Sequence, residues 1–401
     1  MAKRKIQKPT RFERMYKVWD YLRKNTDRRH PTSIAKMRKD ENINAYIGDK
    51  ETINRLLKDM ANIMNLEDGG SDYKPEDEWR LYFDDFKKFY GDKERYERDD
   101  SDEDDSYIAN VMRIKNLYYN RTFSEKEVDS IIEGIMATRT LDSKSAQELV
   151  RKVEDNMTTA FYKRTPRHIC KVQEPELADR ELLKDNLAII QKAIDDNVRI
   201  QFRFNGYSYE KKLEPVRAEM DELSPYYIVA SGGKYYLLAA KEYEGYKPNM
   251  SIWRIDLMTD IEIPGRNDRL HIKGIPRIPK KNVANLPEKW SEDFQLKHLN
   301  MSFDKPVPVT LRIKSEKCED NPKKRVRPGY TFLHDWFGDS FTYIRTETKP
   351  PYDDIVRVEC SPYGMAHWAL QYSELVEVLE PESLREDIKS KIKALNEKYS
   401  L

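Results

Sequence analysis

The first 65 residues carry apolar side chains at the spacing of α-helices. Apolar positions recur every three or four residues over residues 11–24, which predicts a first helix. Pro31 opens a short second helix, and Gly48 can form the turn that follows it. A third helix is predicted to begin after Asp49, a favourable N-cap, and its apolar side consists of Ile53, Leu56, Leu57, Met60 and Ile63. The pattern therefore predicts a small helical module at the amino terminus.

After this module the sequence favours turns, loops and two more helices. Gly69-Gly70 separates two candidate strands, a pattern typical of a hairpin wing. The stretch ERDDSDEDD is a block of like charge, which predicts a solvated loop. Ser124 and Glu127 form a capping-box pattern that begins one amphipathic helix, and a second such helix follows it. Residues 164–180 contain two prolines and are predicted to be a linker that precedes a further helix.

From Val198 onward the apolar period changes from that of helices to that of strands. Apolar and polar side chains alternate in the segment VRIQFRF. PYYIVA and KYYLLAA flank a short Ser-Gly-Gly turn, and SIWRIDLM follows as another strand. Several short strands with tight turns favour a small sheet or barrel. A Pro- and Lys-rich connector, three further strands and a final amphipathic helix complete a chain of the α+β class.

Charge is unevenly distributed, although 36% of the 401 residues are charged and the formal net charge is only +1. Residues 1–60 hold 17 Lys and Arg against 8 Asp and Glu, whereas residues 61–110 hold 7 against 17. Basic segments attract phosphate backbones and acidic segments repel them. The amino-terminal module therefore has the electrostatic character of a nucleic-acid-binding domain.

The third predicted helix divides into an apolar side and a polar side. Its predicted polar side consists of Lys50, Thr52, Asn54, Arg55 and Lys58. A helix in the major groove of DNA needs this division, because Arg can read guanine, Asn can read adenine and Lys can hold phosphate. We take these five residues as the candidate DNA contacts. The alternative is that they only coat a surface helix.

No sequence pattern indicates an enzyme, a cofactor site or a metal site. The six histidines are scattered, and the sequence lacks the HExxH, P-loop and GxSxG motifs. Cys170, Cys318 and Cys360 are far apart and form no CxxC pair, which suits a reducing compartment. No uncharged run approaches the roughly 18 residues of a membrane span. We therefore expect a cytoplasmic protein that is not an enzyme and has no membrane partner.

Three segments resemble the WYL-domain transcriptional regulators. DKETINRLLKDM is similar to the recognition helix of that family, and SPYYIVASGGKYYLLAAKEYEGYKPNMSIWRIDLM is similar to its WYL domain. YGMAHWALQYSELVEVLEPESLREDIKSKIKAL resembles the carboxy-terminal extension often fused to that domain. The resemblance implies a winged helix-turn-helix over residues 1–92, a helical linker region over 107–180, an Sm-like small β-barrel over 181–275 and an α/β extension over 300–401.

The WYL-like segment matches the family motif with one important departure. The family's Trp-Tyr-Leu falls on residues 235–237, where a tyrosine replaces the tryptophan. Its aromatic-Arg-x-Asp run falls on Trp253, Arg254 and Asp256, but Leu257 stands where the family usually has a second arginine. If the strand alternates through Leu257, Trp253 and Leu257 face inward while Arg254 and Asp256 face the opposite side.

The resemblance implies that a basic and aromatic groove of this barrel senses a nucleotide or a single-stranded nucleic acid. Arginine suits phosphate, and tyrosine suits stacking on bases. The candidate ligand-binding residues are Tyr226, Tyr236, Arg254 and Asp256. Two alternatives stay open: Arg254 forms only a surface ion pair with Asp256, and at least one motif tyrosine belongs to the core.

The expected function is that of a ligand-responsive transcriptional regulator. The resemblance implies that it binds double-stranded DNA as a homodimer and that the WYL domain senses the ligand. The alternative is an accessory protein whose WYL domain binds single-stranded RNA or DNA to modulate a CRISPR or antiphage defence effector.

Overall fold

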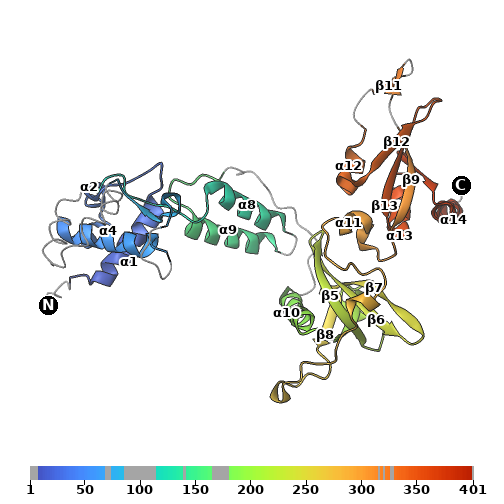
Figure 1. Cartoon of the computed structure of the whole chain (residues 1–401), viewed down its shortest axis with the longest axis horizontal. Coiled ribbons are helices and arrows are strands. Elements are labelled where there is room, and N and C mark those ends of the chain that lie inside the picture. The colour runs from blue at the N-terminus through green and yellow to red at the C-terminus, as the bar shows by residue number, and fades with distance from the viewer. Residues whose placement is uncertain are drawn as a thin grey trace. The chain divides into compact units, whose positions relative to one another are not determined.

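The chain has mixed helix and sheet structure of the α+β class (Figure 1). It divides into two compact units, Met1–Pro175 and Glu176–Leu401. The computed structural model describes residues 8–67, 74–84, 114–138, 141–164, 180–314, 317–318, 321–325 and 329–399.

Four α-helices lie in the part of the amino-terminal domain that the structure describes. They are α1 (Arg11–Asn25), α2 (Ile34–Met37), α3 (Asn44–Ile47) and α4 (Lys50–Asn65). Thr10 and Glu13 form a capping box at α1, and the Asp49 carboxylate accepts a hydrogen bond of 2.7 Å from the Thr52 N–H at α4. The expected start of the third helix after Asp49 is confirmed. The short α3 fills the segment before Gly48, whose φ of 68° favours glycine.

The core of this domain takes residues from well beyond the expected boundary at residue 92. Ile114 and Leu117 are buried together with Leu22 and the apolar side of α4. The short strand β1 (Leu81–Tyr82) pairs antiparallel with β2 (Tyr118–Tyr119). The amino-terminal domain therefore extends at least to Tyr119. Gly69-Gly70 lies outside the described residues, so the hairpin wing stays a prediction.

Two further helices complete the described part of the first unit. α8 (Glu125–Ala137) begins with the expected capping box of Ser124 and Glu127, and α9 (Ser143–Met157) begins after Asp142. Their facing sides form a separate apolar cluster of Val128, Ile132, Val150 and Val153. The helical character expected for this region is confirmed over these two helices.

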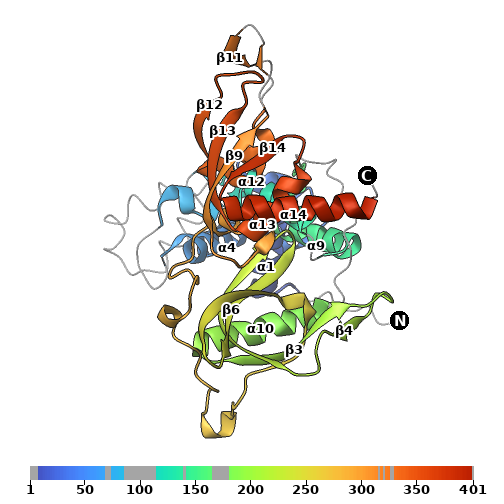
Figure 2. The same cartoon turned by 90° about the vertical axis from the view of Figure 1, so that its right-hand side faces the viewer.

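A curled antiparallel sheet and α10 (Arg180–Asp196) begin the second unit (Figure 2). The strands are β3 (Ile200–Tyr207), β4 (Leu213–Pro215), β5 (Asp221–Ser231), β6 (Lys234–Tyr243), β7 (Tyr246–Arg254) and β8 (Met258–Glu262). They follow the order β4-β3-β5-β6-β7, and β8 also pairs with β3. Ile190 of α10 packs in one core with Phe202, Leu237 and Ile255. The Sm-like barrel that the resemblance implies stays a prediction.

Strand β7 ends earlier than the sequence pattern indicates. Residues Ile255–Leu257 form a single turn of 3-10 helix, η2, before the chain enters β8 at Met258. All four residues from Ile255 to Met258 are buried. The alternation expected through Leu257 is therefore wrong, because a 3-10 turn spaces side chains by about 120° rather than by the 180° of a strand.

The carboxy-terminal domain has a β-α-β-β-α-β order followed by a final helix. Its elements are β9 (Val307–Ile313), α12 (Thr331–Phe337), β12 (Thr342–Thr346), β13 (Asp354–Cys360), α13 (Pro362–Gln371), β14 (Val376–Glu380) and α14 (Glu382–Tyr399). The antiparallel sheet has the order β12-β13-β9-β14, a ferredoxin-like arrangement. Leu333, Phe337, Trp368 and Leu384 bring all three helices into one core with the sheet. A short hairpin of β10 (Lys317–Cys318) and β11 (Asn321–Arg325) follows β9.

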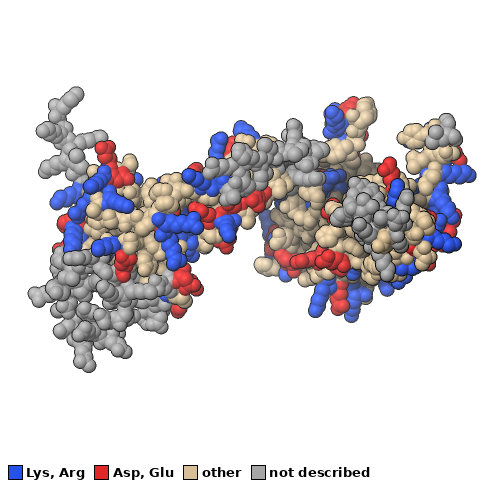
Figure 3. All heavy atoms as spheres, turned by 90° about the horizontal axis from the view of Figure 1, so that it is seen from above, with Lys and Arg blue, Asp and Glu red and all other residues tan. Residues whose placement is uncertain are grey.

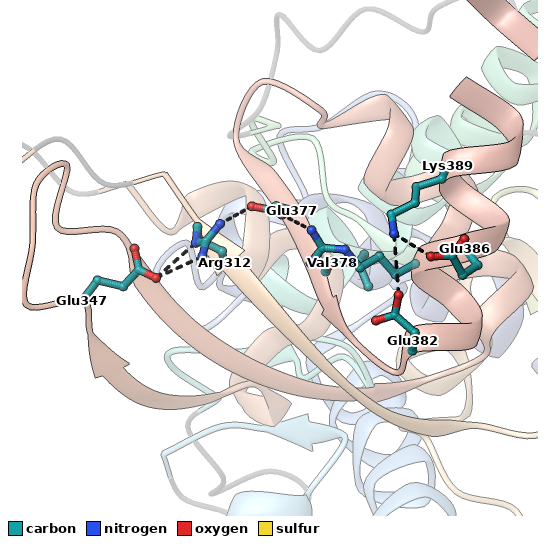
Figure 4. Close-up of polar contacts among 8 residues, drawn as sticks. Arg312, Glu347, Glu377, Val378, Glu382, Glu386 and Lys389 are labelled. Atoms are coloured by element: carbon teal, nitrogen blue, oxygen red, sulfur yellow. Dashed lines mark hydrogen bonds and ion pairs between the residues drawn. The ribbon is translucent and has the colours of Figure 1, made fainter. Parts of the chain in front are cut away.

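A chain of ion pairs links this sheet to α14 (Figure 4). Arg312 of β9 lies 3.1 Å from Glu347 and also pairs with Glu377 of β14. Arg385 of α14 reaches Glu377 at 2.9 Å, and Lys389 lies one turn further along the helix at 2.5 Å from Glu386. Such partly exposed pairs contribute little stability individually, and the Arg385–Glu377 pair is the one of them that joins the helix to the sheet.

The connector between the curled sheet and the carboxy-terminal domain contacts both of them. It includes α11 (Phe294–Lys297) and the turn η5 (Leu299–Met301). Phe294 and Met301 pack in an apolar cluster with Leu238 of β6. The Ser361 N–H, at the start of α13, donates a hydrogen bond of 2.7 Å to the Lys297 carbonyl. The connector thus joins the curled sheet, through β6, to the start of α13 in the carboxy-terminal domain.

Candidate functional site

Asn54 lies in the core rather than on the exposed side of α4. Its exposed fraction is 0%, and its neighbours along the helix, Ile53 and Leu57, are buried as well. A helix turns about 100° per residue, so position 54 shares one side with positions 57 and 61. The prediction that Asn54 contacts DNA is therefore wrong.

The other four candidates remain accessible on α4. Lys50 and Arg55 are exposed, while Thr52 and Lys58 are half-buried. The Arg55 guanidinium forms an ion pair of 2.8 Å with Glu51, and these side chains are 50% and 39% exposed. A surface ion pair of this kind contributes at most about 1 kcal/mol of stability. A phosphate or a guanine edge can therefore replace Glu51 as the partner of Arg55 with little loss of free energy.

Arg254 is held by a buried carboxylate at the end of β7. Its Nε and Nη2 atoms donate to the two oxygens of Asp256 at 3.1 and 2.5 Å. The Asp256 side chain is 2% exposed and the Arg254 side chain 30%. Burial lowers the pKa of Arg254, but the hydrogen bonds and charge of Asp256 outweigh this effect and hold that pKa above its ordinary value. The ion pair weighed as an alternative is therefore present, and it is a bidentate pair with a buried partner.

Two tyrosines lie beside this pair. Tyr236 of β6 is directly opposite Arg254 in the β6–β7 register, and burial raises the pKa of its hydroxyl. Tyr207, at the end of β3, is also close enough to interact electrostatically with Arg254, and it is 47% exposed. The sequence alone does not show that Tyr207 lies near Arg254, because its position depends on how the sheet curls. The site therefore combines one fixed cation with two aromatic rings.

Tyr226 does not belong to this site. It is 2% exposed, and its hydroxyl donates a hydrogen bond of 2.7 Å to the Ile278 carbonyl. The β5–β6 register shifts between Pro225 and Tyr227, so strand alternation cannot predict the direction of the residue between them. The prediction that Tyr226 contacts the ligand is therefore not retained.

Two buried asparagines hold the turn that carries Asp256. The Asn186 amide on α10 donates to the carbonyls of Ile255 and Met258 at 3.3 and 2.8 Å. The Asn205 amide on β3 donates to the Leu257 carbonyl at 3.0 Å. Their exposed fractions are 0% and 3%. Sequence periodicity alone gave no signal for either residue, since each acts on a segment more than fifty positions away.

Basic and acidic side chains are mixed on the face of the molecule that Figure 3 draws. Figure 3 shows several separate groups of Lys and Arg side chains, with acidic side chains between them. Within the described ranges, no three His, Cys, Asp or Glu side chains are placed to hold a metal ion. The helices described are all too short or too polar to cross a membrane.

The comparison with known domain families identifies the carboxy-terminal domain. Residues 305–395 match the WCX domain. The match begins just before β9 and ends within α14, so it covers the ferredoxin-like sheet with its helices. WCX domains are found in WYL-associated regulators, and the match therefore supports the resemblance of this segment to the extension of that family.

Two solved structures show a weak similarity to this chain. Proteasome accessory factor B/C (PafBC) of Arthrobacter aurescens is 17% identical with a TM-score of 0.24, over 72% of this chain and 39% of that chain. This chain thus spans well under two thirds of that structure. A CRISPR Cas-related protein is 13% identical with a TM-score of 0.29, over 87% of this chain and 86% of that chain. Both TM-scores are too low to indicate a shared fold over the whole chain, and no curated protein matches.

Proposed function

We propose that the chain is a ligand-responsive DNA-binding regulator without catalytic activity. In this proposal α4 belongs to a winged helix-turn-helix that reads an operator, and the curled sheet is a WYL domain that senses a nucleotide or a single-stranded nucleic acid. The observation that carries the proposal is Arg254, fixed by buried Asp256 beside Tyr207 and Tyr236. An oriented guanidinium can hold phosphate while the rings stack on bases. The WCX match over residues 305–395 supports the proposal, because WCX domains are found in WYL-associated regulators.

A homodimer is part of the same proposal. Leu384 anchors the start of α14 in the core, whereas Ile392, Leu395 and Tyr399 near its end are 50%, 45% and 68% exposed. Figure 2 shows these last turns extending beyond the sheet. These side chains form an apolar stripe at heptad-like spacing, which a symmetric contact can cover. Because the stripe is small, we expect it to be only one part of the dimer interface.

Arg55→Ala and Lys58→Ala should weaken DNA binding in different ways. Loss of an Arg55 base contact should reduce affinity for the specific duplex by about 1–3 kcal/mol, with a much smaller effect on unrelated duplexes. Loss of a Lys58 phosphate contact should weaken all duplexes alike and reduce the salt slope by about 0.9. Titration of labelled duplexes at several salt concentrations measures both effects, and the same titration should give two chains per operator.

Lys24→Ala is a suitable control, because Lys24 lies near the end of α1, is 52% exposed at its side chain and pairs with Asp20 of the same helix. If the Arg55 and Lys58 variants bind every duplex as this control does, α4 is not the DNA-reading helix.

A further inference from the structure

A second basic and aromatic surface lies on the same face of the curled sheet as Arg254. It is centred on Tyr227 of β5, whose hydroxyl accepts a hydrogen bond of 2.8 Å from Lys280 Nζ. That ammonium also lies 4.2 Å from the centre of the Tyr227 ring. The ring of Trp290 lies 5.8 Å from Tyr227 and is tilted by 47°, with 44% of the residue exposed. We call Tyr227, Arg277, Lys280 and Trp290 the connector platform.

The two cations of the connector platform, Arg277 and Lys280, form hydrogen bonds to neutral groups rather than to carboxylates. Arg277 donates to the Pro225 carbonyl at 2.8 Å and to Asn197 Oδ1 at 2.6 Å. Its guanidinium lies 5.1 Å from the centre of the Tyr226 ring, and burial lowers its pKa. In the part of the chain that the structure describes, neither Arg277 nor Lys280 has a carboxylate within ion-pair distance.

The neighbouring Arg199 behaves in the ordinary way for a surface arginine of this domain. It pairs with Glu222 at 2.9 Å and with Glu242 at 2.8 Å. A half-buried cation without such a partner retains an uncompensated positive potential, which favours a bound anion. The contrast with Arg199 marks Arg277 and Lys280 as the cations available to an anionic ligand.

The strand register relates the connector platform to Arg254. Val229, Tyr236 and Arg254 are paired across β5, β6 and β7, and Tyr227, Leu238 and Ile252 form the next row on the same face. Tyr227 and Tyr236 pack against the same apolar cluster. Tyr227 lies two strands away from Arg254 and two residues further along the strand direction. Their backbones are therefore roughly 12 Å apart. Half-buried Tyr236 lies between them.

We infer that the connector platform is a second subsite for a single-stranded nucleic acid that also reaches Arg254. Exposed Trp290 stacks on a base, while Lys280 and Arg277 face the phosphodiester backbone. Stacking surfaces and cations in alternation bind single strands with little sequence preference, and a lysine or arginine on a tyrosine ring is already oriented for this task. The inference rests on the proposed function, since it extends the ligand site from one phosphate to at least two nucleotides.

Titration of a labelled oligothymidylate into the full chain tests the connector platform. Trp290→Ala should weaken binding about tenfold, and Trp290→Phe should recover most of this loss because it retains a stacking ring. Lys280→Met should reduce the salt slope by about 0.7. Tyr246→Ala and Lys212→Ala are the matched controls. Tyr246 is 78% exposed, and the Lys212 side chain is 72% exposed and paired with Glu210.

The outcomes separate this inference from the proposed function. If Trp290→Ala and Lys280→Met bind the strand as their controls do, while Arg254→Lys weakens binding, the connector platform is rejected and the Arg254 site stands. If the wild-type chain does not bind the strand, both the platform and the nucleic-acid ligand are rejected. Denaturant unfolding of each variant shows whether a loss of affinity comes from a loss of folded protein.

Discussion

Arg254→Ala should destabilise the second unit by about 2 kcal/mol, in addition to removing the ligand response. The substitution leaves the Asp256 carboxylate buried without its bidentate partner. Breaking a fully buried pair costs about 3–5 kcal/mol, and the smaller value is expected here because the guanidinium remains 30% exposed. Urea unfolding of the full chain, followed by a signal from the second unit, measures this change.

Companion variants separate the structural role of Arg254 from its role toward a ligand. Removing both charges in Arg254→Ala/Asp256→Asn should be less destabilising than Arg254→Ala alone, because no buried charge is left unpaired. Arg254→Lys should keep most of the stability but weaken phosphate binding, since lysine cannot donate in the same bidentate geometry. An Arg254→Ala protein that unfolds at the wild-type urea concentration would show that the pair contributes nothing to the fold.

Gly364→Ala should destabilise the contact between the connector and α13 by about 1–3 kcal/mol. A Cβ at Gly364 would lie 2.6 Å from the Leu299 carbonyl and 2.8 Å from the hydroxyls of Ser302 and Ser361. Because a backbone atom stands closest, the connector must move to admit the methyl group. We expect lower thermal stability of the second unit and faster proteolysis within residues 293–302.

Gly134→Ala is the matched control for this substitution. Gly134 also lies in a helix, α8, but apart from its chain neighbours and the helix's own backbone no described atom lies within 4 Å of the position that a Cβ would take. Alanine there should stabilise the helix by about 0.5–1 kcal/mol, because glycine loses more conformational freedom on folding. Equal effects of the two substitutions would contradict the close approach at Gly364.

Local signals predicted the beginnings of helices well. Asp49 and the capping box of Ser124 and Glu127 begin α4 and α8 as expected. The residues of a helix cap lie within about one helical turn of each other, so the sequence alone shows the pattern. The same holds for the strands around the Ser-Gly-Gly turn, because a tight turn fixes its own two strands.

Side-chain directions were predictable only where the local geometry continued unchanged. Asn54 was assigned to the polar side of α4 because it is polar, but packing of the domain buries the side of the helix on which it lies. Tyr226 falls at a register shift, and Asp256 falls in the 3-10 turn after β7. In each case a tertiary or irregular feature overrides the simple period.

The WYL-like motif falls on two neighbouring strands, but other elements also contribute to the candidate site. Arg254 and Tyr236 are opposite each other, as a motif of two neighbouring strands requires. Tyr207 of β3 interacts electrostatically with Arg254, and Asn186 of α10 holds the turn that carries Asp256. These contacts join segments that are far apart in the chain, and a single sequence does not show which distant segments lie close together in the fold.

The most direct test of ligand-responsive regulation is the affinity of the full chain for its duplex with and without a single-stranded ligand. Fluorescence anisotropy of a labelled operator duplex, identified by selection from random duplexes, gives this affinity as an unlabelled oligothymidylate is added. Ligand-responsive regulation predicts a change of at least fivefold for the wild type, the lower end of ordinary allosteric coupling, and no change for Arg254→Lys. An unchanged duplex affinity despite saturation by the single strand would contradict ligand-responsive regulation and favour an accessory protein that only binds single strands.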